Sequence, residues 1–357
     1  MALRLARAKT NRTAVVCLNH GYHGHTQSLI DVSPYKFSGP GGEGAPCHVR
    51  VVPCPDVYRG PYKRSDPDAG LKYAECGPIK LINEGLQPCA FIAETFPSVA
   101  GQIELPHGYL SAVYSCVRSA GGLCIADEVQ TGFGRLGSAF WGFEAHGVVP
   151  DIVTLGKPIG NGFPMGAVVT TCEIAAAFDN GMEFFCTGGG GPAAAAAGRA
   201  VLSVLRDMNL PANAEKMGVY LKSKLNDLAL RHTLIGDVRG RGLFLGLELV
   251  RDRETLQVPS ALFKFILQLT HSRTLPARPC RGVIRCEPFA RQRHPRWNRG
   301  TTPQRHQSAA AIVFQPARCR LHGRVPRCNP EGGWLVTRMK PCLLSGHQQL
   351  QHVEIYW

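Results

Sequence analysis

Two short apolar runs in the middle of the chain constrain its fold more than any other feature. Residues 123–126 and 151–155 are each too short for a stable helix. Runs of this kind are typical of strands that are buried on both faces of a parallel sheet. The first run leads directly into Asp127, and Lys157 follows the second after one glycine. A carboxylate and an amine therefore leave the carboxyl edge of one sheet, where open α/β sheets bind ligands.

Strand and helix patterns alternate along most of the remaining chain. Residues 13–18, 90–93 and 167–171 are apolar and of strand type. Helical spacing at 71–86 and a crossover helix at 108–120 separate these runs. The alternation predicts an α/β fold with right-handed βαβ units and a mostly parallel central sheet flanked by helices.

The second half of the chain predicts two longer helices and the beginning of a small domain. Residues 193–205 form a good helix pattern, preceded by a proline that suits a first turn. Residues 212–231 are amphipathic and predict a bridge to the small domain. Their apolar face is formed by Met217, Leu221, Leu225 and Leu228. In contrast, residues 38–70 are rich in Gly, Pro and Asp and are expected to be a surface connection. The glycine-rich run at 39–44 is not a phosphate-binding loop, because no Gly-Lys-Ser/Thr sequence follows it.

The net charge of +14 is concentrated at one end of the chain. Residues 271–357 hold 15 of the 40 basic residues and only 3 of the 26 acidic ones. The body is therefore nearly neutral, and nucleic-acid binding would depend on this segment alone. The segment shows little periodicity, so an altered reading frame or an alternative exon explains it better than a nucleic-acid-binding tail. We expect no nucleic-acid partner.

Cysteine usage and hydropathy point to a protein without disulfides or membrane spans. The 14 cysteines come without a secretory signal, which favours reduced thiols in a cytosolic or organellar compartment. No apolar run approaches the roughly 18 residues that a membrane helix needs. The cysteines show no paired zinc spacing, and His20, His23 and His25 lack a neighbouring cysteine or carboxylate, so no metal site is expected.

Two motifs carry a resemblance to a known family. Residues 127–135 read DEVQTGFGR, and residues 156–162 read GKPIGNG. Both resemble class III aminotransferases, which are pyridoxal-phosphate enzymes of fold type I. The resemblance covers residues 1–270 and implies a large cofactor-binding domain at 1–210 and the start of a small C-terminal α/β domain at 211–270, with 271–357 as a basic tail.

The resemblance also bears on the first residues of the chain. Their arginine-rich, acid-free composition is that of a mitochondrial transit peptide. In the family, however, a phosphate-binding turn runs into a helix that residues 2–7 match. We favour this helix, which implies that the chain begins after the family's phosphate turn and lacks the preceding segment.

The resemblance assigns roles to five residues around the cofactor ring. Lys157 would form the resting Schiff base and later move the substrate's Cα proton. Asp127 would pair with the ring nitrogen. Tyr22 would stack on one ring face and Val129 would pack on the other, while Gln130 would hydrogen-bond the ring hydroxyl.

Two further residues are assigned by the same resemblance. Thr187, in a glycine-rich loop before the helix at 193–205, would reach the cofactor phosphate of a neighbouring subunit, which implies a homodimer. Glu94, at the end of a strand, would lie near the substrate or pair with an arginine.

The sequence therefore predicts a pyridoxal-phosphate-dependent aminotransferase acting on an amine or amino acid and an oxo acid. A phospho-lyase acting on a phosphorylated amine is an alternative, because phrases at 29–37 and 55–64 resemble the ethanolamine-phosphate and phosphohydroxylysine phospho-lyase subgroup. A catalytically inactive truncated product is another. We expect a cytoplasmic location, with the mitochondrion as the alternative.

Overall fold

The computed structural model of the chain describes residues 1–182, 184–257, 311–313 and 353–356. The predicted basic tail at 271–357 lies outside the described residues, except for two short strands. The part of the predicted small domain beyond residue 257 also lies outside them.

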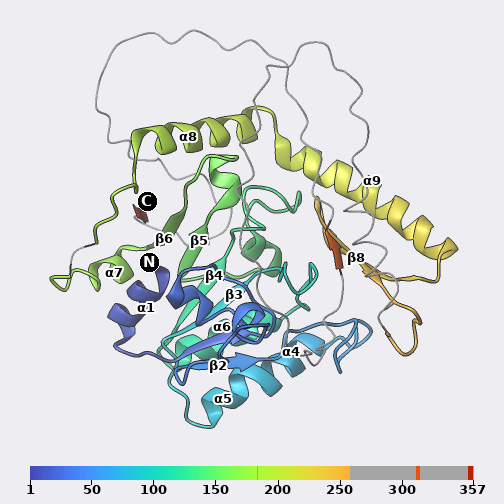
Figure 1. Cartoon of the computed structure of the whole chain (residues 1–357), viewed down its shortest axis with the longest axis horizontal. Helices are drawn as coiled ribbons and strands as arrows, with labels where there is room; N and C mark the ends of the chain where they lie inside the picture. The colour runs from blue at the N-terminus through green and yellow to red at the C-terminus, as the bar shows by residue number, and fades with distance from the viewer. Residues whose placement is uncertain (183, 258–310, 314–352, 357) are drawn as a thin grey trace, which may run out of the picture.

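A seven-stranded sheet forms the centre of the described structure (Figure 1). Its strands lie in the order β10-β6-β5-β4-β3-β1-β2. All neighbours from β2 to β5 are parallel, whereas β6 is antiparallel to both β5 and β10. The bounds are β1 Val15–Leu18, β2 Val49–Val52, β3 Ala90–Glu94, β4 Leu123–Asp127, β5 Ile152–Leu155, β6 Ala167–Thr171 and β10 Val353–Tyr356. The predicted α/β fold with a mostly parallel sheet is confirmed.

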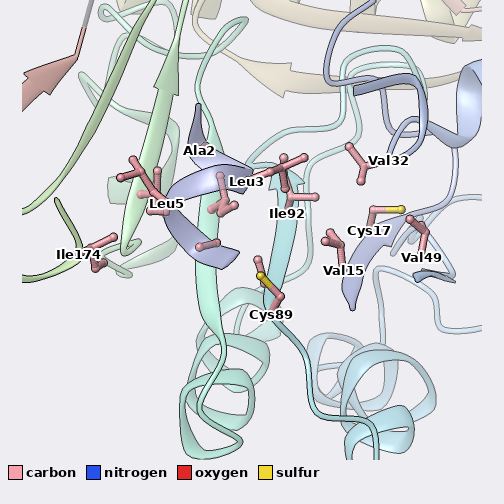
Figure 2. Close-up of a cluster of buried hydrophobic side chains, with 14 of the residues drawn as sticks. Ala2, Leu3, Leu5, Val15, Cys17, Val32, Val49, Cys89, Ile92 and Ile174 are labelled. Atoms are coloured by element: carbon pink, nitrogen blue, oxygen red, sulfur yellow. The ribbon is translucent and has the colours of Figure 1, made fainter. Parts of the chain in front are cut away.

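Helices cover both faces of this sheet, because successive residues of a strand point to opposite faces. On one face, Val15 and Ile92 pack in a cluster with α1 and α7 (Figure 2). On the other face, their neighbours Val16 and Phe91 pack with α4 and α6. The helices of this domain are α1 Ala2–Thr10, α2 Gln27–Ile30, α3 Pro34–Phe37, α4 Ala69–Ala74, α5 Lys80–Asn83, α6 Tyr109–Ser119 and α7 Cys172–Ala176.

Helix α1 confirms the helix predicted at residues 2–7. Leu5 and Ala6 are fully buried and lie in the cluster of Figure 2, beside Ile174 of α7. The helix ends at Thr10, and its C-cap is Asn11, which has a left-handed backbone (φ 53°) and donates its N–H to Arg7 O, as is common at helix C-termini. The first residues are thus part of the core on one face of the seven-stranded sheet.

Two predictions about the segment between β1 and β3 were wrong. The connection expected at 38–70 contains β2, whose outer position lets Val49 and Val52 bury while the two residues between them stay exposed. The helix expected at 71–86 is broken into α4, a π-type turn η1 (Glu75–Ile79) and α5. The break lies at Gly77, whose backbone is non-helical, and at Pro78, which follows it. Proline has no N–H to donate, so a continuous helix loses a hydrogen bond at this position.

The remaining described residues form two long helices and a small sheet. Helix α8 spans Pro192–Asp207 and α9 spans Leu210–Arg231, as predicted within a few residues. A sheet of order β7-β8-β9 follows, with β7 Ile235–Arg241, β8 Phe244–Leu249 and β9 Ala311–Val313. Leu225 of α9 packs on this sheet with Leu245 and Leu247.

One residue expected on the apolar face of α9 does not lie there. Met217 is 41% exposed. The helix instead presents Gly218 to the turn at Gly242, so closely that a Cβ on Gly218 would lie 2.1 Å from Gly242 O. Gly218, and not Met217, is therefore the residue that α9 places against this turn.

Among the residues described, no helix is long and apolar enough to cross a membrane. The nine cysteines of this part of the chain are free thiols.

Candidate active site

The carboxyl ends of β1, β3, β4 and β5 meet at one edge of the sheet. Glu94 and Asp127 are register partners at the ends of β3 and β4, so their side chains leave the same face. Asp127 is in turn the register partner of Thr154 in β5, three residues before Lys157. The structure therefore gathers at one edge the carboxylates and the lysine that the sequence singled out.

A buried pair joins Asp127 to His23 at this edge. His23 Nδ1 lies 2.8 Å from Asp127 Oδ2, and the two side chains are only 1% and 5% exposed. Because an ionised carboxylate can only accept, His23 Nδ1 donates this hydrogen bond. Asp127 Oδ1 accepts the N–H of Val129 at 3.1 Å. Asp127 is thus held in a fixed orientation by groups from two different loops.

His23 was not predicted to act in the site. No sequence pattern relates His23 to Asp127. They are 104 residues apart in the sequence. His20 and His25, its neighbours in the histidine-rich turn, are exposed. The described residues contain no group of three or more histidine, cysteine or acidic side chains that could hold a metal ion.

Glu94 is buried beside this pair. Its Oε2 accepts hydrogen bonds from the N–H of Ser98, at 3.0 Å, and from the Ser98 hydroxyl. Its Oε1 is buried without a partner among the described residues. Burial raises the pKa of Glu94, and the nearby charge of Asp127 raises it further, while His23 opposes the shift. In this arrangement Glu94 pairs with a serine rather than with an arginine of the described chain.

Lys157 begins a short 3-10 turn, η3 (Lys157–Gly160), directly after β5. Its φ of 35° lies in the left-handed region, which is uncommon for residues other than glycine. Such strained backbones cluster at functional sites. The side chain is exposed, and its ammonium makes no ion pair with any described carboxylate. The preceding Gly156 lies so close to Val129 that a Cβ would be 3.3 Å from Val129 Cγ1.

A third buried carboxylate, Glu128, fastens the end of β4 to the loop around residue 142. It accepts hydrogen bonds from the N–H groups of Gly142 and Phe143 at 2.8 and 2.9 Å. The hydroxyls of Thr131 and Thr95 also donate to it, at 2.7 and 3.1 Å. Burial raises the pKa of Glu128, and these hydrogen bonds counteract the shift. This network was not predicted, because its partners come from three separate segments.

The other predicted residues are placed less centrally. Tyr22, next to His23, is half-buried, and so are Val129 and Gln130 after β4. Thr187 is exposed on the loop before α8. The structure thus brings Asp127, Val129 and His23 into contact but leaves Thr187 on the surface of the chain.

A cavity of about 380 Å³ lies elsewhere, lined by residues of the 56–70, 103–108 and 145–146 segments and of β7. Arg64, His107, His146, Arg239 and Arg241 are among the residues that line it. Its arginines already pair with carboxylates: Arg64 and Arg239 with Asp237, and Arg241 with Glu104. None of the predicted site residues lines this cavity.

A model of the family described as aminotransferase class-III matches residues 1–286, which extends beyond Thr270, where the resemblance was expected to stop. Alanine–glyoxylate aminotransferase 2-like of Drosophila melanogaster is 52% identical over 263 residues, which cover 71% of this chain and 53% of that protein. The human mitochondrial alanine–glyoxylate aminotransferase 2 is 42% identical over 275 residues, with coverages of 71% and 53%. The chain spans about half the length of these curated relatives.

Solved structures that resemble this chain include a phospholyase and an aminotransferase. A phospholyase from Arthrobacter in complex with phosphoethanolamine has a TM-score of 0.68 and 36% identity, and the match covers 76% of this chain and 64% of that one. A taurine:2-oxoglutarate aminotransferase from Bifidobacterium kashiwanohense, in complex with PLP and glutamate, has a TM-score of 0.67 and 27% identity, with coverages of 76% and 63%.

Proposed function

The chain belongs to the class-III aminotransferases, and from this premise we propose that it is a pyridoxal-phosphate-dependent enzyme that transfers an amino group between an amine or amino acid and an oxo acid. One observation carries the proposal. The buried pair of Asp127 and His23 lies at the sheet edge from which Lys157 emerges. A fixed carboxylate and an available amine are the two groups that such an enzyme needs from its protein.

The residues at this edge fit pyridoxal phosphate. His23 Nε2 and Glu94 Oε1 are buried polar atoms without partners among the described residues, and such atoms normally find one. Asp127 keeps lone pairs free beyond its two observed hydrogen bonds. The exposed Lys157 ammonium has no described carboxylate to compete for it.

When bound, pyridoxal phosphate supplies an electron sink for the charge that develops at the substrate carbon beside the amino group. Asp127 would keep the proton on the ring nitrogen, and His23 fixes the orientation of the Asp127 carboxylate. Lys157 Nζ would be the atom that holds the cofactor. As a free amine, the same Nζ would be the base that moves the substrate's Cα proton.

Three neighbours position the cofactor ring in this proposal. Tyr22 would stack on the ring, since a flat ring gains dispersion energy from an aromatic partner. Val129, which is held beside Asp127 by its own N–H, would pack against the ring from the other side. Gln130, the next residue, would hydrogen-bond the ring hydroxyl.

A homodimer completes the site in this proposal. Thr187 is exposed, which supports a role toward the cofactor phosphate of a second subunit rather than of its own. Phe185, two residues earlier, is 84% exposed, as expected for an apolar side chain that a partner would cover.

Glu94 is the proposed substrate-side carboxylate. Its unpartnered Oε1 supports a role in receiving a cationic group, because a buried carboxylate oxygen is stabilised strongly by an opposite charge.

Phospho-lyase activity on a phosphorylated amine is the second candidate, and the similarity to the Arthrobacter phospholyase supports it. Both reactions begin with removal of the same Cα proton, so the residues named above serve either one.

The test is a paired assay on the purified chain with pyridoxal phosphate. With glyoxylate present as the amino acceptor, pyruvate formation from alanine reports amino transfer, and phosphate release from phosphoethanolamine reports elimination. We expect Lys157→Ala to lower either rate by about 100-fold or more, because it removes a positioned base. Exposed Lys63, far along the chain from this edge, provides the control variant Lys63→Ala, which should keep the rate. Equal rates in the Lys157→Ala variant and the unmodified chain would refute the proposal.

The compartment is also a proposal. The sequence favours the cytoplasm, while the name of the human relative supports the mitochondrial alternative. Cell fractionation of the tagged chain distinguishes the two.

A further inference from the structure

The buried carboxylate Glu94 receives its hydrogen bonds from a single residue. Among the described residues, only Ser98 donates to it: the Ser98 hydroxyl and the Ser98 N–H both reach Oε2, the N–H at 3.0 Å. Ser98 is itself 4% exposed, so its hydroxyl lies away from solvent. Because Oε2 is held in this way, the orientation of the carboxyl group is fixed, and Oε1 remains without a described partner.

Ser98 is held in turn by a tight turn in the loop that follows β3. Its carbonyl oxygen accepts hydrogen bonds from the N–H groups of Gly101 and Gln102 at 3.0 and 3.2 Å, and from the Gln102 side chain at 3.1 Å. Gln102 is buried, and its φ of 54° lies in the left-handed region, which is uncommon for residues other than glycine. Such a backbone persists only where its surroundings enforce it. The turn at 98–102 therefore fixes the position of Ser98.

The small sheet secures this turn. Arg239 of β7 donates from Nε to Gly101 O at 2.8 Å. Gly246 of β8 packs against the same carbonyl, since a Cβ there would lie 2.8 Å from Gly101 O. Arg239 is the only buried lysine or arginine of the described residues, and its Nη1 lies 3.2 Å from Asp237 and 2.5 Å from Glu248. A buried, charge-paired side chain thus connects the β7–β8 hairpin to the turn.

The hydrogen bonds from Ser98 also bear on the charge of Glu94. Burial and the nearby carboxylate of Asp127 raise the pKa of Glu94, whereas His23 and both Ser98 donors lower it. Burial also raises the pKa of the nearby Cys54 thiol, so this thiol stays neutral and adds no charge. Ser98 and His23 are therefore the groups that favour the ionised form of Glu94, and only this form attracts a cation strongly.

We propose that Ser98 is a positioning residue for amino transfer. It orients Glu94 and keeps it ionised to receive the ammonium group of the substrate, and Arg239 holds Ser98 in place through the turn at Gly101. This inference rests on the proposed function, in which Glu94 is the substrate-side carboxylate. It makes the β7–β8 hairpin a support of the site.

Carbon-13 NMR of the glutamate carboxyl groups tests the link from Ser98 to Glu94 without any catalysis. The Glu94 signal is identified by its loss in Glu94→Gln, and its pH titration is compared between the unmodified chain and Ser98→Ala. The variant keeps the backbone N–H and removes the hydroxyl. We expect the midpoint of Glu94 to rise by about one to two pH units, which corresponds to one hydrogen bond to a charged group.

Two further variants make this titration specific. Ser98→Thr keeps a hydroxyl and should restore the original midpoint. Ser111 of α6 is exposed, so Ser111→Ala is the matched control and should leave the midpoint unchanged. An unchanged midpoint in Ser98→Ala, or a midpoint raised equally in Ser98→Thr, would overturn the role of the hydroxyl.

Steady-state kinetics with alanine and glyoxylate test the link from Glu94 to the substrate. Ser98→Ala should raise the KM for alanine by about 10-fold and change kcat by less than about threefold, because binding of the ammonium group is weakened. The acid limb of the kcat/KM profile should move to higher pH together with the Glu94 midpoint. A fall in kcat alone, or an acid limb that does not move, would contradict the inference.

Arg239→Lys tests the support from the hairpin. It keeps a positive charge beside Asp237 and Glu248 but has no Nε to donate to Gly101 O. We expect a rise in KM smaller than that of Ser98→Ala, and no additional rise when the two substitutions are combined, since both act through the same contact with Glu94. Fully additive effects would show that Arg239 does not act through Ser98.

Labelling of Lys157 by the cofactor, measured on each sample, separates this inference from the proposed function. A chain that is labelled at Lys157 and converts alanine but is indifferent to Ser98→Ala contradicts the role of Ser98 only. A chain that is never labelled contradicts the proposed function, and the NMR titration still decides whether Ser98 sets the charge of Glu94.

Discussion

His146 should make this protein lose stability as the pH falls below neutral. Its Nε2 lies 3.0 Å from Thr95 O and donates to that carbonyl, and its ring lies 4.9 Å from the ring of Phe96. Burial lowers the pKa of His146 from 6.5 to about 4, and the positive charge of Arg241 adds to the shift. The folded protein therefore keeps His146 neutral at a pH at which the unfolded chain protonates it. The resulting stability is present above pH 6.5 and is lost as the pH falls toward the lowered pKa of about 4.

The magnitude follows from the two pKa values. Proton linkage between 6.5 in the unfolded chain and about 4 in the folded one removes about 2 kcal/mol between about pH 7 and about pH 5. The variant His146→Gln keeps a donor for Thr95 O but cannot titrate. Urea unfolding of both proteins at the two pH values gives the difference, and subtraction of the variant cancels the contribution of the other histidines.

The reasoning predicts that the unmodified chain loses about 2 kcal/mol more than His146→Gln on acidification. An equal loss in both proteins would show that His146 is protonated in the folded state at little cost, and it would refute the buried, neutral assignment.

Two stability predictions concern the core and the loop behind the site. Leu5→Ala should lower the free energy of unfolding by about 2–5 kcal/mol, because Leu5 is fully buried, whereas Leu230→Ala, at a position that is 88% exposed, should change it by less than about 0.5 kcal/mol. Glu128→Ala should cost about 3–5 kcal/mol, since the buried N–H groups of Gly142 and Phe143 lose their acceptor. Urea unfolding at neutral pH measures both, and a loss below about 1 kcal/mol would contradict the role of Leu5 or of Glu128.

The sequence predicted those parts of the fold that local patterns determine. The strands β3, β4 and β5 and the helices α8 and α9 follow from short apolar runs and helical spacing, and the structure confirms them. Only Ile152 of β5 is buried, although the sequence predicted a strand buried on both faces. Strand β2 was missed because only two of its four residues are buried and glycines and prolines flank it. The face of α9 was misjudged at Met217, because the close approach of Gly218 to Gly242 joins residues that no local pattern relates.

In the candidate site too, only the residues marked by a local sequence pattern could be predicted. Asp127 and Lys157 could be selected because each directly follows a predicted strand. The hydrogen-bond partners that hold these residues could not be selected from the sequence. His23 is 104 residues from Asp127, and Gly142 is 14 residues from Glu128. Such pairs are set by the register of the strands, which only the folded sheet defines.

Covalent labelling of the cofactor lysine tests the central claim most directly. The purified chain is mixed with pyridoxal phosphate, its visible absorption is recorded, and borohydride reduction is followed by peptide mapping. Our account predicts a new visible band and a single labelled lysine, Lys157, with both lost in Lys157→Ala and retained in the control Lys63→Ala. No band, or a label spread over many exposed lysines, would contradict the account.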